Sequence, residues 1–266
     1  MSEKIDEITF IVAVNDEQVF ENNLYASEIL RDNKINNIIK QYNYSSASLA
    51  YNEAIKKIEN EILIFVHQDV YFPNTWRREL VNALQLLDRE DPRWAVAGVY
   101  GVTASGQGVG HVYSSGLRCF VGEAFKEPVR VSTLDEMVLI IRKSSGLNFD
   151  EGLPGFHLYG ADICLEAERR GMTSYVIPCF TVHNSCGINW LPIIFWKAYM
   201  YLRRKWRSRL PIFTPCTIIS FSCSAIFDHV LRNIYLRVRG GNTPGCRVKD
   251  PEIFYRERIM PVLAER

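Results

Sequence analysis

The chain has 266 residues, of which 47% are hydrophobic and 12% aromatic, so it is long enough to bury a sizeable core in one large domain. Its 31 basic and 30 acidic residues give a net charge of +1, and this balance excludes a polybasic nucleic-acid binder. The charges are unevenly placed, because residues 191–266 hold 14 of the basic residues and only 5 of the acidic ones. This asymmetry predicts two surfaces with different partners, neither of them nucleic acid.

The N-terminal residues Met1–Glu7 are charged and lead into an apolar run, so they predict no secretory signal. The seven cysteines are scattered, which is typical of reduced thiols in a cytoplasm. Cys179, His183 and Cys186 lie close together, but without a second Cys/His pair a zinc site is the less favoured interpretation. The uncharged stretch Leu210–Phe227 contains prolines, serines and threonines, which favours a core or interfacial segment over a membrane span. We therefore expect a cytoplasmic protein.

Strands and helices alternate along roughly the first 190 residues. We expect strands at Ile8–Val14, Ile35–Ile39 (a weak one), Glu61–Val66, Trp94–Val99 and Met137–Arg142, and a final strand pair at Tyr175–Ile177 and Phe180–His183. We expect helices at Ser45–Ile58, Trp76–Leu87 and Ala161–Arg170, and a helix or irregular connector at Glu17–Ile29. The glycine-rich segment Gly98–Gly110 predicts a mobile loop. Such alternation is typical of an α/β layer fold.

From Trp190 onward the composition changes to tryptophan, tyrosine, arginine and lysine mixed with aliphatic residues. This pattern predicts one or two amphipathic helices with a basic face. We therefore expect a catalytic domain at residues 1–190 and a basic, aromatic-rich helical extension at 191–266. The extension could dock on an anionic membrane face, or it could form a basic groove for an anionic acceptor or a packed lid.

Polar residues follow two of the predicted strands, Asn15-Asp16 after the first and His67-Gln68-Asp69 after the most apolar one. In open α/β sheets ligands bind at the carboxyl ends of the strands. A rigidly held carboxylate such as Asp69 suits a hard divalent cation, which also bridges to phosphate oxygens. The alternative is a turn aspartate that caps the segment Phe72–Trp76.

The segment Ile62–Val70 (ILIFVHQDV) resembles the apolar strand and Asp-x-Asp motif of GT-A-fold glycosyltransferases of family 2. His67 takes the place of the first aspartate and Asp69 that of the last, as in a subgroup with His-Gln-Asp in place of Asp-x-Asp. The resemblance implies a divalent metal, Mn²⁺ or Mg²⁺, held by Asp69 against the diphosphate of a nucleotide-sugar. A histidine ligand at His67 would favour Mn²⁺. The alternative is a strand-end histidine bonded to the backbone.

Further segments follow in the family's order over roughly residues 8–186. Ile8–Asp16 resembles the first strand, whose end contacts the nucleotide base, so Asn15 and Asp16 are candidate donor-binding residues together with Gln68. Ser46–Ala54 (SASLAYNEA) resembles a segment with a donor-side asparagine, here Asn52.

The acceptor side and the metal site resemble the family as well. Val131–Arg142 matches a strand with an aspartate near the donor sugar, here Asp135, which is followed by Glu136. The segment after Phe149-Asp150-Glu151 resembles the block whose helix-start acid is the general base. Ala161 replaces the first acid of that block and Asp162 keeps the second, so Asp162 is the expected base, with a plain helix N-cap as the alternative. His183 matches a histidine that closes the metal site.

The resemblance implies a GT-A (Rossmann-like) mixed, mostly parallel sheet flanked by helices and an inverting glycosyltransferase. Its partners would be a nucleotide-sugar donor and a glycan or lipid-linked acceptor, and its location cytoplasmic or peripheral on the inner membrane face. A catalytically impaired nucleotide-sugar-binding module is the alternative, because His67 and Ala161 replace acids. A nucleotidyltransferase is disfavoured, since no glycine-rich phosphate loop with a following lysine is present.

Overall fold

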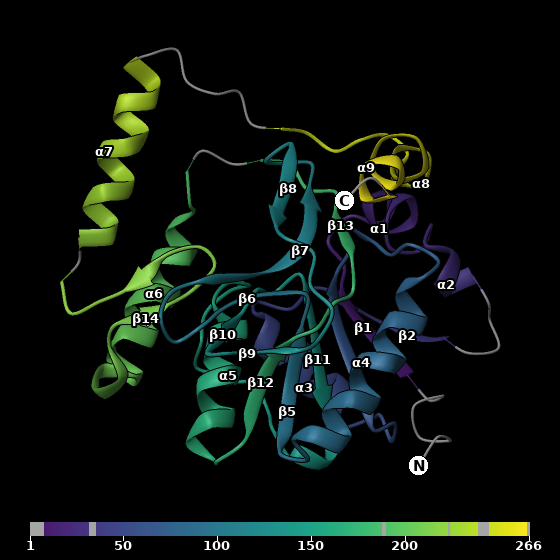
Figure 1. Ribbon diagram of the computed structural model, residues 1–266. Helices are drawn as coiled ribbons and strands as arrows, with labels where there is room; N and C mark the ends of the chain where they lie inside the picture. The colour runs from purple at the N-terminus through teal and green to yellow at the C-terminus, as the bar shows by residue number, and fades with distance from the viewer. Residues whose placement is uncertain (1–7, 32–35, 188–189, 223, 239–244, 265–266) are drawn as a thin grey trace.

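The computed structural model describes residues 8–31, 36–187, 190–222, 224–238 and 245–264 (Figure 1). The strands are β1 Ile8–Ala13, β2 Asn36–Gln41, β3 Ile62–His67, β4 Val70–Tyr71, β5 Trp94–Gly98, β6 Tyr100–Val102, β7 Gly108–Ser114, β8 Cys119–Gly122, β9 Val129–Val131, β10 Thr133–Leu134, β11 Val138–Arg142, β12 Thr173–Val176, β13 Thr181–His183, β14 Ile212–Phe213 and β15 Ile218–Ile219. The α-helices are α1 Glu17–Asn22, α2 Glu28–Arg31, α3 Ala47–Ile55, α4 Trp76–Glu90, α5 Tyr159–Arg169, α6 Ile193–Lys205, α7 Ser224–Val238, α8 Pro251–Phe254 and α9 Met260–Ala264.

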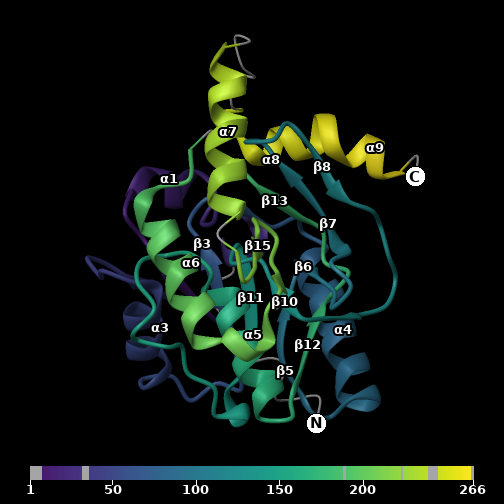
Figure 2. The ribbon, with the colours of Figure 1, turned by 90° about the vertical axis from the view of Figure 1, so that its left-hand side faces the viewer.

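In the described residues the central sheet has seven strands in the order β2-β1-β3-β11-β5-β12-β9. β1 pairs in parallel with both β2 and β3, and β12 pairs in parallel with β5, whereas β11 is antiparallel to its neighbours β3 and β5. The sheet is therefore mixed, and its helices cover both faces, with α3 and α5 on one side and α4 on the other (Figures 1 and 2). The expected mixed α/β fold class is confirmed, but the central sheet is not mostly parallel, because three of its six pairings in the described residues, including that of β12 with β9, are antiparallel.

Alternate residues of the central strands enter two different cores. In β3, Leu63 and Phe65 point into the core beneath α3, α5 and α6, while Ile64 and Val66 pack against α1 and α4. This follows from the twofold period of a strand whose two faces are both covered, which is why its sequence is wholly apolar. The apolar face of α4, repeating every three or four residues from Trp76 to Leu87, fills the second core.

A second sheet, of six strands in the part of the chain that the structure describes, lies across one end of the central sheet; five of them follow the order β10-β6-β7-β13-β4, and β8 pairs with β7. The prediction of a mobile loop at Gly98–Gly110 is wrong, because β6 and the start of β7 pair there as an antiparallel hairpin. The glycines serve close backbone approach instead. A Cβ on Gly110, whose φ is +143°, would stand 2.5 Å from the Tyr100 ring.

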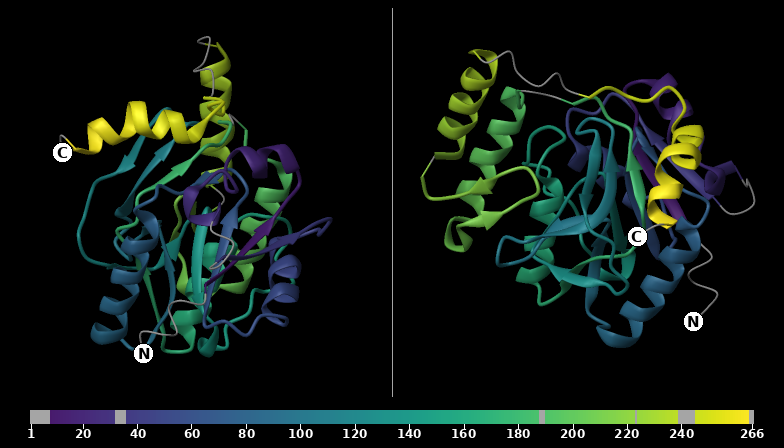
Figure 3. Two further views of the ribbon diagram at one scale, coloured as in Figure 1. Left: turned by 90° about the vertical axis from the view of Figure 1, so that its right-hand side faces the viewer. Right: turned by 45° about the horizontal axis from the view of Figure 1, so that its top comes forward.

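The described part of residues 191–266 holds α6, the β14–β15 hairpin, α7, α8 and α9, more than the one or two helices expected, and these elements are not one unit. α6 buries Phe195, Ala198, Tyr199 and Leu202 in the same core as α3 and α5. α7 extends beyond α6, as Figure 2 shows, and α8 and α9 lie near α1 at the far edge of the second sheet (Figure 3). Among the described residues no helix is both long and apolar enough to cross a membrane.

Candidate functional site

Three side chains that could hold a metal ion meet where the two sheets join. His67 ends β3, Asp69 lies in the turn before β4, and His183 ends β13, which pairs with β4 opposite Val70. Each offers a ligand atom, and these atoms lie within 4.8 Å of one another. The histidine Nε2 of His183 is 3.4 Å from Oδ1 of Asp69, and these two side chains are only 21% and 12% exposed.

Two imidazoles and a carboxylate are a set that suits Mn²⁺ and similar ions, so the residues fit a divalent cation. Burial by itself raises the pKa of Asp69, but His183, His67 and Arg247 outweigh it and hold that pKa well below its usual range. Burial lowers the pKa of His67 more than the neighbouring Asp69 raises it, whereas Asp69 raises the pKa of His183 despite the burial of that residue. Coordination of a cation by all three residues therefore needs an ionised Asp69 and the loss of the proton that Asp69 favours on His183.

The structure does not show the alternatives considered for His67 and Asp69, namely a histidine bonded to the backbone and a turn aspartate. The ring of His67 bonds through Nε2 to the Tyr159 hydroxyl at 3.1 Å, a side chain and not the backbone. The N–H of Phe72 donates to Ser27 Oγ at 2.9 Å, so Ser27 and not Asp69 satisfies that turn. Within the described chain neither neighbouring cysteine belongs to a metal-binding group, so nothing supports the zinc interpretation.

Arg247 is the residue of this site that the sequence did not indicate. Its Nη2 lies 3.3 Å from Oδ2 of Asp69. Residues 245–250, here called the C-terminal strap, bring it there. Asn184 fixes the strap by accepting from the Val248 N–H at 2.8 Å and donating to the Val248 carbonyl at 2.9 Å. No local sequence signal could have found this contact, because 178 positions separate Arg247 from Asp69.

Gln68 joins the end of β3 to the end of β1. Its Oε1 accepts from the backbone N–H groups of Asn15 and Asp16 at 3.0 and 3.2 Å, and its Nε2 donates to Oδ1 of Asn15. The Asp16 carboxylate also caps α1 by accepting from the Val19 N–H at 3.1 Å. The structure therefore brings these three predicted donor-binding residues together at one edge of the central sheet.

Asn52 is held by the loop that precedes α5. Its side chain donates to the Phe149 carbonyl at 2.9 Å and accepts from the Phe149 N–H at 2.9 Å. A further bond reaches Glu151 at 3.1 Å. With both ends of the amide used in this way, Asn52 joins α3 to that loop in the described structure.

Asp135 and Glu136 lie beside the histidine and aspartate cluster. The Tyr159 hydroxyl, which bonds to His67 at 3.1 Å, also donates to the backbone carbonyl of Glu136 at 3.3 Å. Glu136 accepts from the Gly160 N–H at the start of α5 at 3.3 Å. Enclosure by protein, followed by the charge of Asp135, raises the pKa of Glu136 to about 8. Glu136 is thus a carboxyl group poised to exchange a proton near neutral pH.

Asp162 is in a different environment. It is 3% exposed, and its two oxygens accept from Lys205 Nζ at 2.7 and 2.8 Å. The Trp206 indole N–H donates to it at 2.6 Å, and Lys205 also pairs with Asp150 at 2.7 Å. These bonds tie α5 to the end of α6. The helix N-cap position belongs to Leu158, so Asp162 is not a plain N-cap.

The sequence of residues 9–190 matches the model of a family described as "Glycosyltransferase like family". A curated protein of Fuscovulum blasticum, named "ATP synthase subunits region ORF 6", is 32% identical over 143 residues, which are 50% of this chain and 55% of that protein. The chain thus spans about half the length of this curated relative.

Solved structures of low sequence identity are similar in overall course. GalNAc-T7 with UDP, GalNAc and Mn²⁺ is 12% identical, with 97% of this chain and 57% of that chain covered and a TM-score of 0.46. S. aureus TarS is 16% identical, with 75% and 39% covered and a TM-score of 0.49. The mannosyltransferase PcManGT from Pyrobaculum calidifontis, in complex with GDP-Man and Mn²⁺, is 11% identical, with 90% and 66% covered and a TM-score of 0.44.

Proposed function

We propose that this chain, which belongs to the glycosyltransferase-like family, transfers a sugar from a nucleotide-sugar donor to a hydroxyl group of a glycan or lipid-linked acceptor, with inversion. The observation that carries the proposal is the His67, Asp69 and His183 cluster at the ends of β3 and β13, with Arg247 at its edge. Cationic and metal-ligating groups gathered at strand ends suit a diphosphate.

In this reaction the bond between the anomeric carbon and the diphosphate oxygen breaks, and its electron pair leaves with the diphosphate. The acceptor oxygen forms the new bond to that carbon, and its proton passes to a carboxylate of the protein. A divalent cation bound by His67, Asp69 and His183 would offset the charge that develops on the leaving diphosphate. Arg247, whose guanidinium lies beside Asp69, adds a second positive charge for the same phosphate oxygens.

The contacts support Glu136 as the base more than Asp162, the residue that the sequence proposes. Asp162 has both oxygens bonded to Lys205, and that pair must be broken before Asp162 can accept a proton. Burial raises the pKa of both acids, but the Glu136 carboxylate accepts from the Gly160 N–H and not from a lysine, so it can take up a proton without breaking an ion pair with Lys205. Asp135 fits a positioning role near the donor sugar, and its own Oδ1 accepts from the Met137 N–H at 2.9 Å.

The network of Asn15, Asp16 and Gln68 supports binding of the nucleoside end of the donor. It lies at the end of β1, next to the strand that carries His67, so a nucleotide placed there has its phosphates at the cluster. Asn52 is proposed to act on the donor indirectly, by holding the loop at Phe149.

An inactive nucleotide-sugar-binding module is the competing proposal, because acids are replaced at His67 and Ala161. The test is a panel of nucleotide sugars with Mn²⁺ and purified protein, read out as thermal stabilisation and as slow donor hydrolysis. Hydrolysis of one donor supports the enzyme. Stabilisation without hydrolysis across the whole panel supports the inactive module. If no donor causes either stabilisation or hydrolysis, both the enzyme and the inactive module are excluded.

We also propose that α7 and the neighbouring end of α6, within the basic residues 191–266, contact an anionic membrane surface. Four large apolar side chains on α7 are 50–68% exposed, namely Phe227, Leu231, Ile234 and Tyr235. Arg232 lies on the same helix. Arg203, Arg204 and Arg207 line a neighbouring groove with Met200. Exposed apolar residues beside arginines suit the interface of an anionic bilayer.

A further inference from the structure

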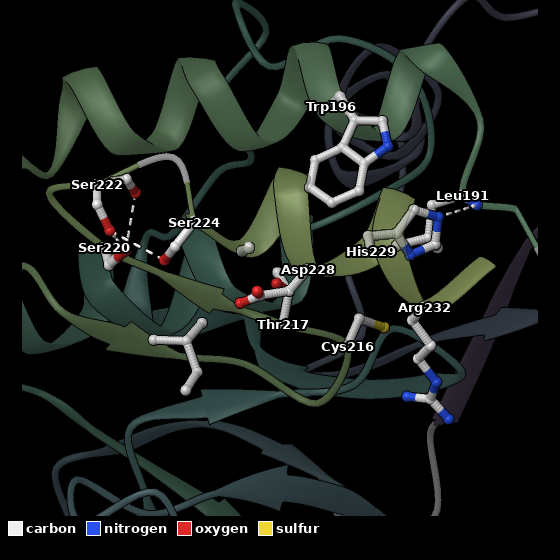
Figure 4. A pocket seen from close by; sticks show the side chains of 12 residues that line it. Leu191, Trp196, Cys216, Thr217, Ser220, Ser222, Ser224, Asp228, His229 and Arg232 are labelled. Carbon is white, nitrogen blue, oxygen red and sulfur yellow. Dashed lines mark hydrogen bonds between the residues drawn. The ribbon is translucent and has the colours of Figure 1, made fainter. Parts of the chain in front are cut away.

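A cavity of about 540 Å³ lies between α6, the β14–β15 hairpin and α7, and its lining includes none of His67, Asp69 and His183. Figure 4 shows the Trp196 ring projecting from α6 toward the cavity, with His229 and Arg232 on one side and Ser220, Ser222 and Ser224 on the other. Ligand pockets typically measure about 300–1,000 Å³, so this cavity has room for a small ligand.

The lining of the cavity mixes aromatic faces with short polar groups. The Trp196 and His229 rings are 5.2 Å apart, and His229 accepts from the Leu191 N–H through Nε2 at 3.2 Å, which fixes the imidazole. Asp228 and Arg232 bring one negative and one positive charge, and the serine hydroxyls can donate and accept. The opposite charges argue against a phosphate, and the hydroxyls argue against a plain apolar chain.

The cavity also leads toward the proposed base. Thr133, two residues before Asp135, donates from Oγ1 to the Phe213 carbonyl at 2.6 Å and so fixes the hairpin against β10. The turn of that hairpin carries Cys216, whose thiol lines the cavity. The hairpin that lines one side of the cavity is thus bonded to β10, the strand that directly precedes Asp135 and Glu136.

We propose that this cavity binds the sugar end of the acceptor and directs a hydroxyl group toward Glu136, an inference that rests on the proposed transferase function. A pyranose ring has an apolar C–H face for Trp196 and equatorial hydroxyl groups for Asp228 and the serines. This pairing of one aromatic wall with scattered neutral and charged hydrogen-bonding groups selects a hydroxyl-rich ligand. The donor phosphates stay at the cluster, so the reacting carbon comes between the two sites.

The test is saturation-transfer NMR of the full chain with a panel of methyl glycosides, namely those of glucose, galactose, mannose, N-acetylglucosamine and N-acetylgalactosamine. Wild type should bind at least one of them. Trp196→Ala and Asp228→Asn should each weaken that binding by about fivefold or more. Asp228 is exposed, so its variant will keep the fold even if loss of the half-buried indole does not.

Met200→Ala, on the same helix but lining a different groove, and Glu90→Gln, an exposed acid on α4, are the matched controls and should bind as wild type does. No binding by wild type, or binding unchanged in both cavity variants, would overturn the assignment of the cavity. Donor hydrolysis by wild type is measured in parallel. Its absence across all donors overturns the proposed function and the acceptor role with it, whereas normal hydrolysis with unchanged glycoside binding overturns the cavity alone.

Discussion

The proposed donor and acceptor sites differ in how their side chains are held. On the donor side, His67 and His183 end paired strands, and the turn between β3 and β4 carries the mostly buried Asp69. On the acceptor side, the cavity is lined by the helices α6 and α7 and a short hairpin, and Asp228 is exposed. The groups for phosphate chemistry are thus on the sheet, and those for recognition are at the periphery.

This difference in support predicts which substitutions will remove activity and which will change only affinity or preference. A metal site needs its ligands fixed to within a fraction of an ångström, which paired strands provide. A site that recognises a sugar can be built from elements that vary without disturbing the sheet. Changes on the donor side should therefore remove activity, while changes on the acceptor side should shift affinity or preference.

The largest effect is expected for Asp69→Asn. It removes the anionic metal ligand and the partner of Arg247, so Mn²⁺-dependent donor binding should weaken by about 100-fold or more. Titration calorimetry with a nucleoside diphosphate, with and without Mn²⁺, measures this loss. Glu90→Gln is the charge-matched control, and unchanged Mn²⁺ dependence in the Asp69 variant would place the metal elsewhere.

A second large effect separates the two candidate bases. Glu136→Gln should leave donor binding intact while turnover falls roughly 10²–10⁴-fold, the usual contribution of general base catalysis. Asp162→Asn should instead lower the melting temperature, because it leaves Lys205 without its buried partner. The reverse pattern, with turnover lost only in the Asp162 variant, would restore Asp162 as the base.

The pH dependence of turnover follows from the same assignment. Glu136 must be deprotonated to accept the acceptor's proton, and its pKa is raised to about 8. Turnover should therefore rise about tenfold per pH unit below that pKa and level off above it. A profile recorded from pH 5.5 to 9.5 under saturating donor checks this, and a rise that persists in Glu136→Gln would assign the titration to another group.

A smaller effect is expected for Arg247→Gln. Loss of one charge-assisted contact should reduce affinity for a nucleoside diphosphate in Mn²⁺ by roughly tenfold. Lys249→Gln changes the same charge two residues along the C-terminal strap and serves as the control. Unchanged diphosphate affinity together with tighter Mn²⁺ binding would mean that Arg247 only occupies the place of the metal.

The smallest effect concerns the membrane. The double variant Phe227→Ser, Leu231→Ser should reduce co-sedimentation with vesicles of phosphatidylglycerol and phosphatidylcholine by about fivefold at low salt. Leu117→Ser is the control, since Leu117 is 66% exposed in the turn between β7 and β8. Equal binding to vesicles without anionic lipid would contradict the proposal.

The sequence alone predicted the features that depend on neighbouring residues. The wholly apolar run of β3 indicated a buried central strand, and the polar residues after it indicated a site at the sheet edge. The meeting of His67 and Asp69 with His183 was also predicted, although only through the resemblance to a family. A glycine-rich segment can form either a mobile loop or a close strand pair, and here the prediction of a loop was wrong. Gly108 and Gly110 belong to a tight antiparallel pair of strands.

Only the tertiary structure decided which distant charges meet. Asp162 lies in the first turn of α5, and Glu136 lies next to the start of that helix. Asp162 is bound by Lys205 from α6, whereas Glu136 is enclosed beside Asp135. Arg247 reaches Asp69 only because Asn184 holds the C-terminal strap. The pKa and the partner of a side chain depend on its surroundings in space. The sequence therefore determined which chemical groups are available near the strand ends, and the packing of the C-terminal region decided which of them are free to act.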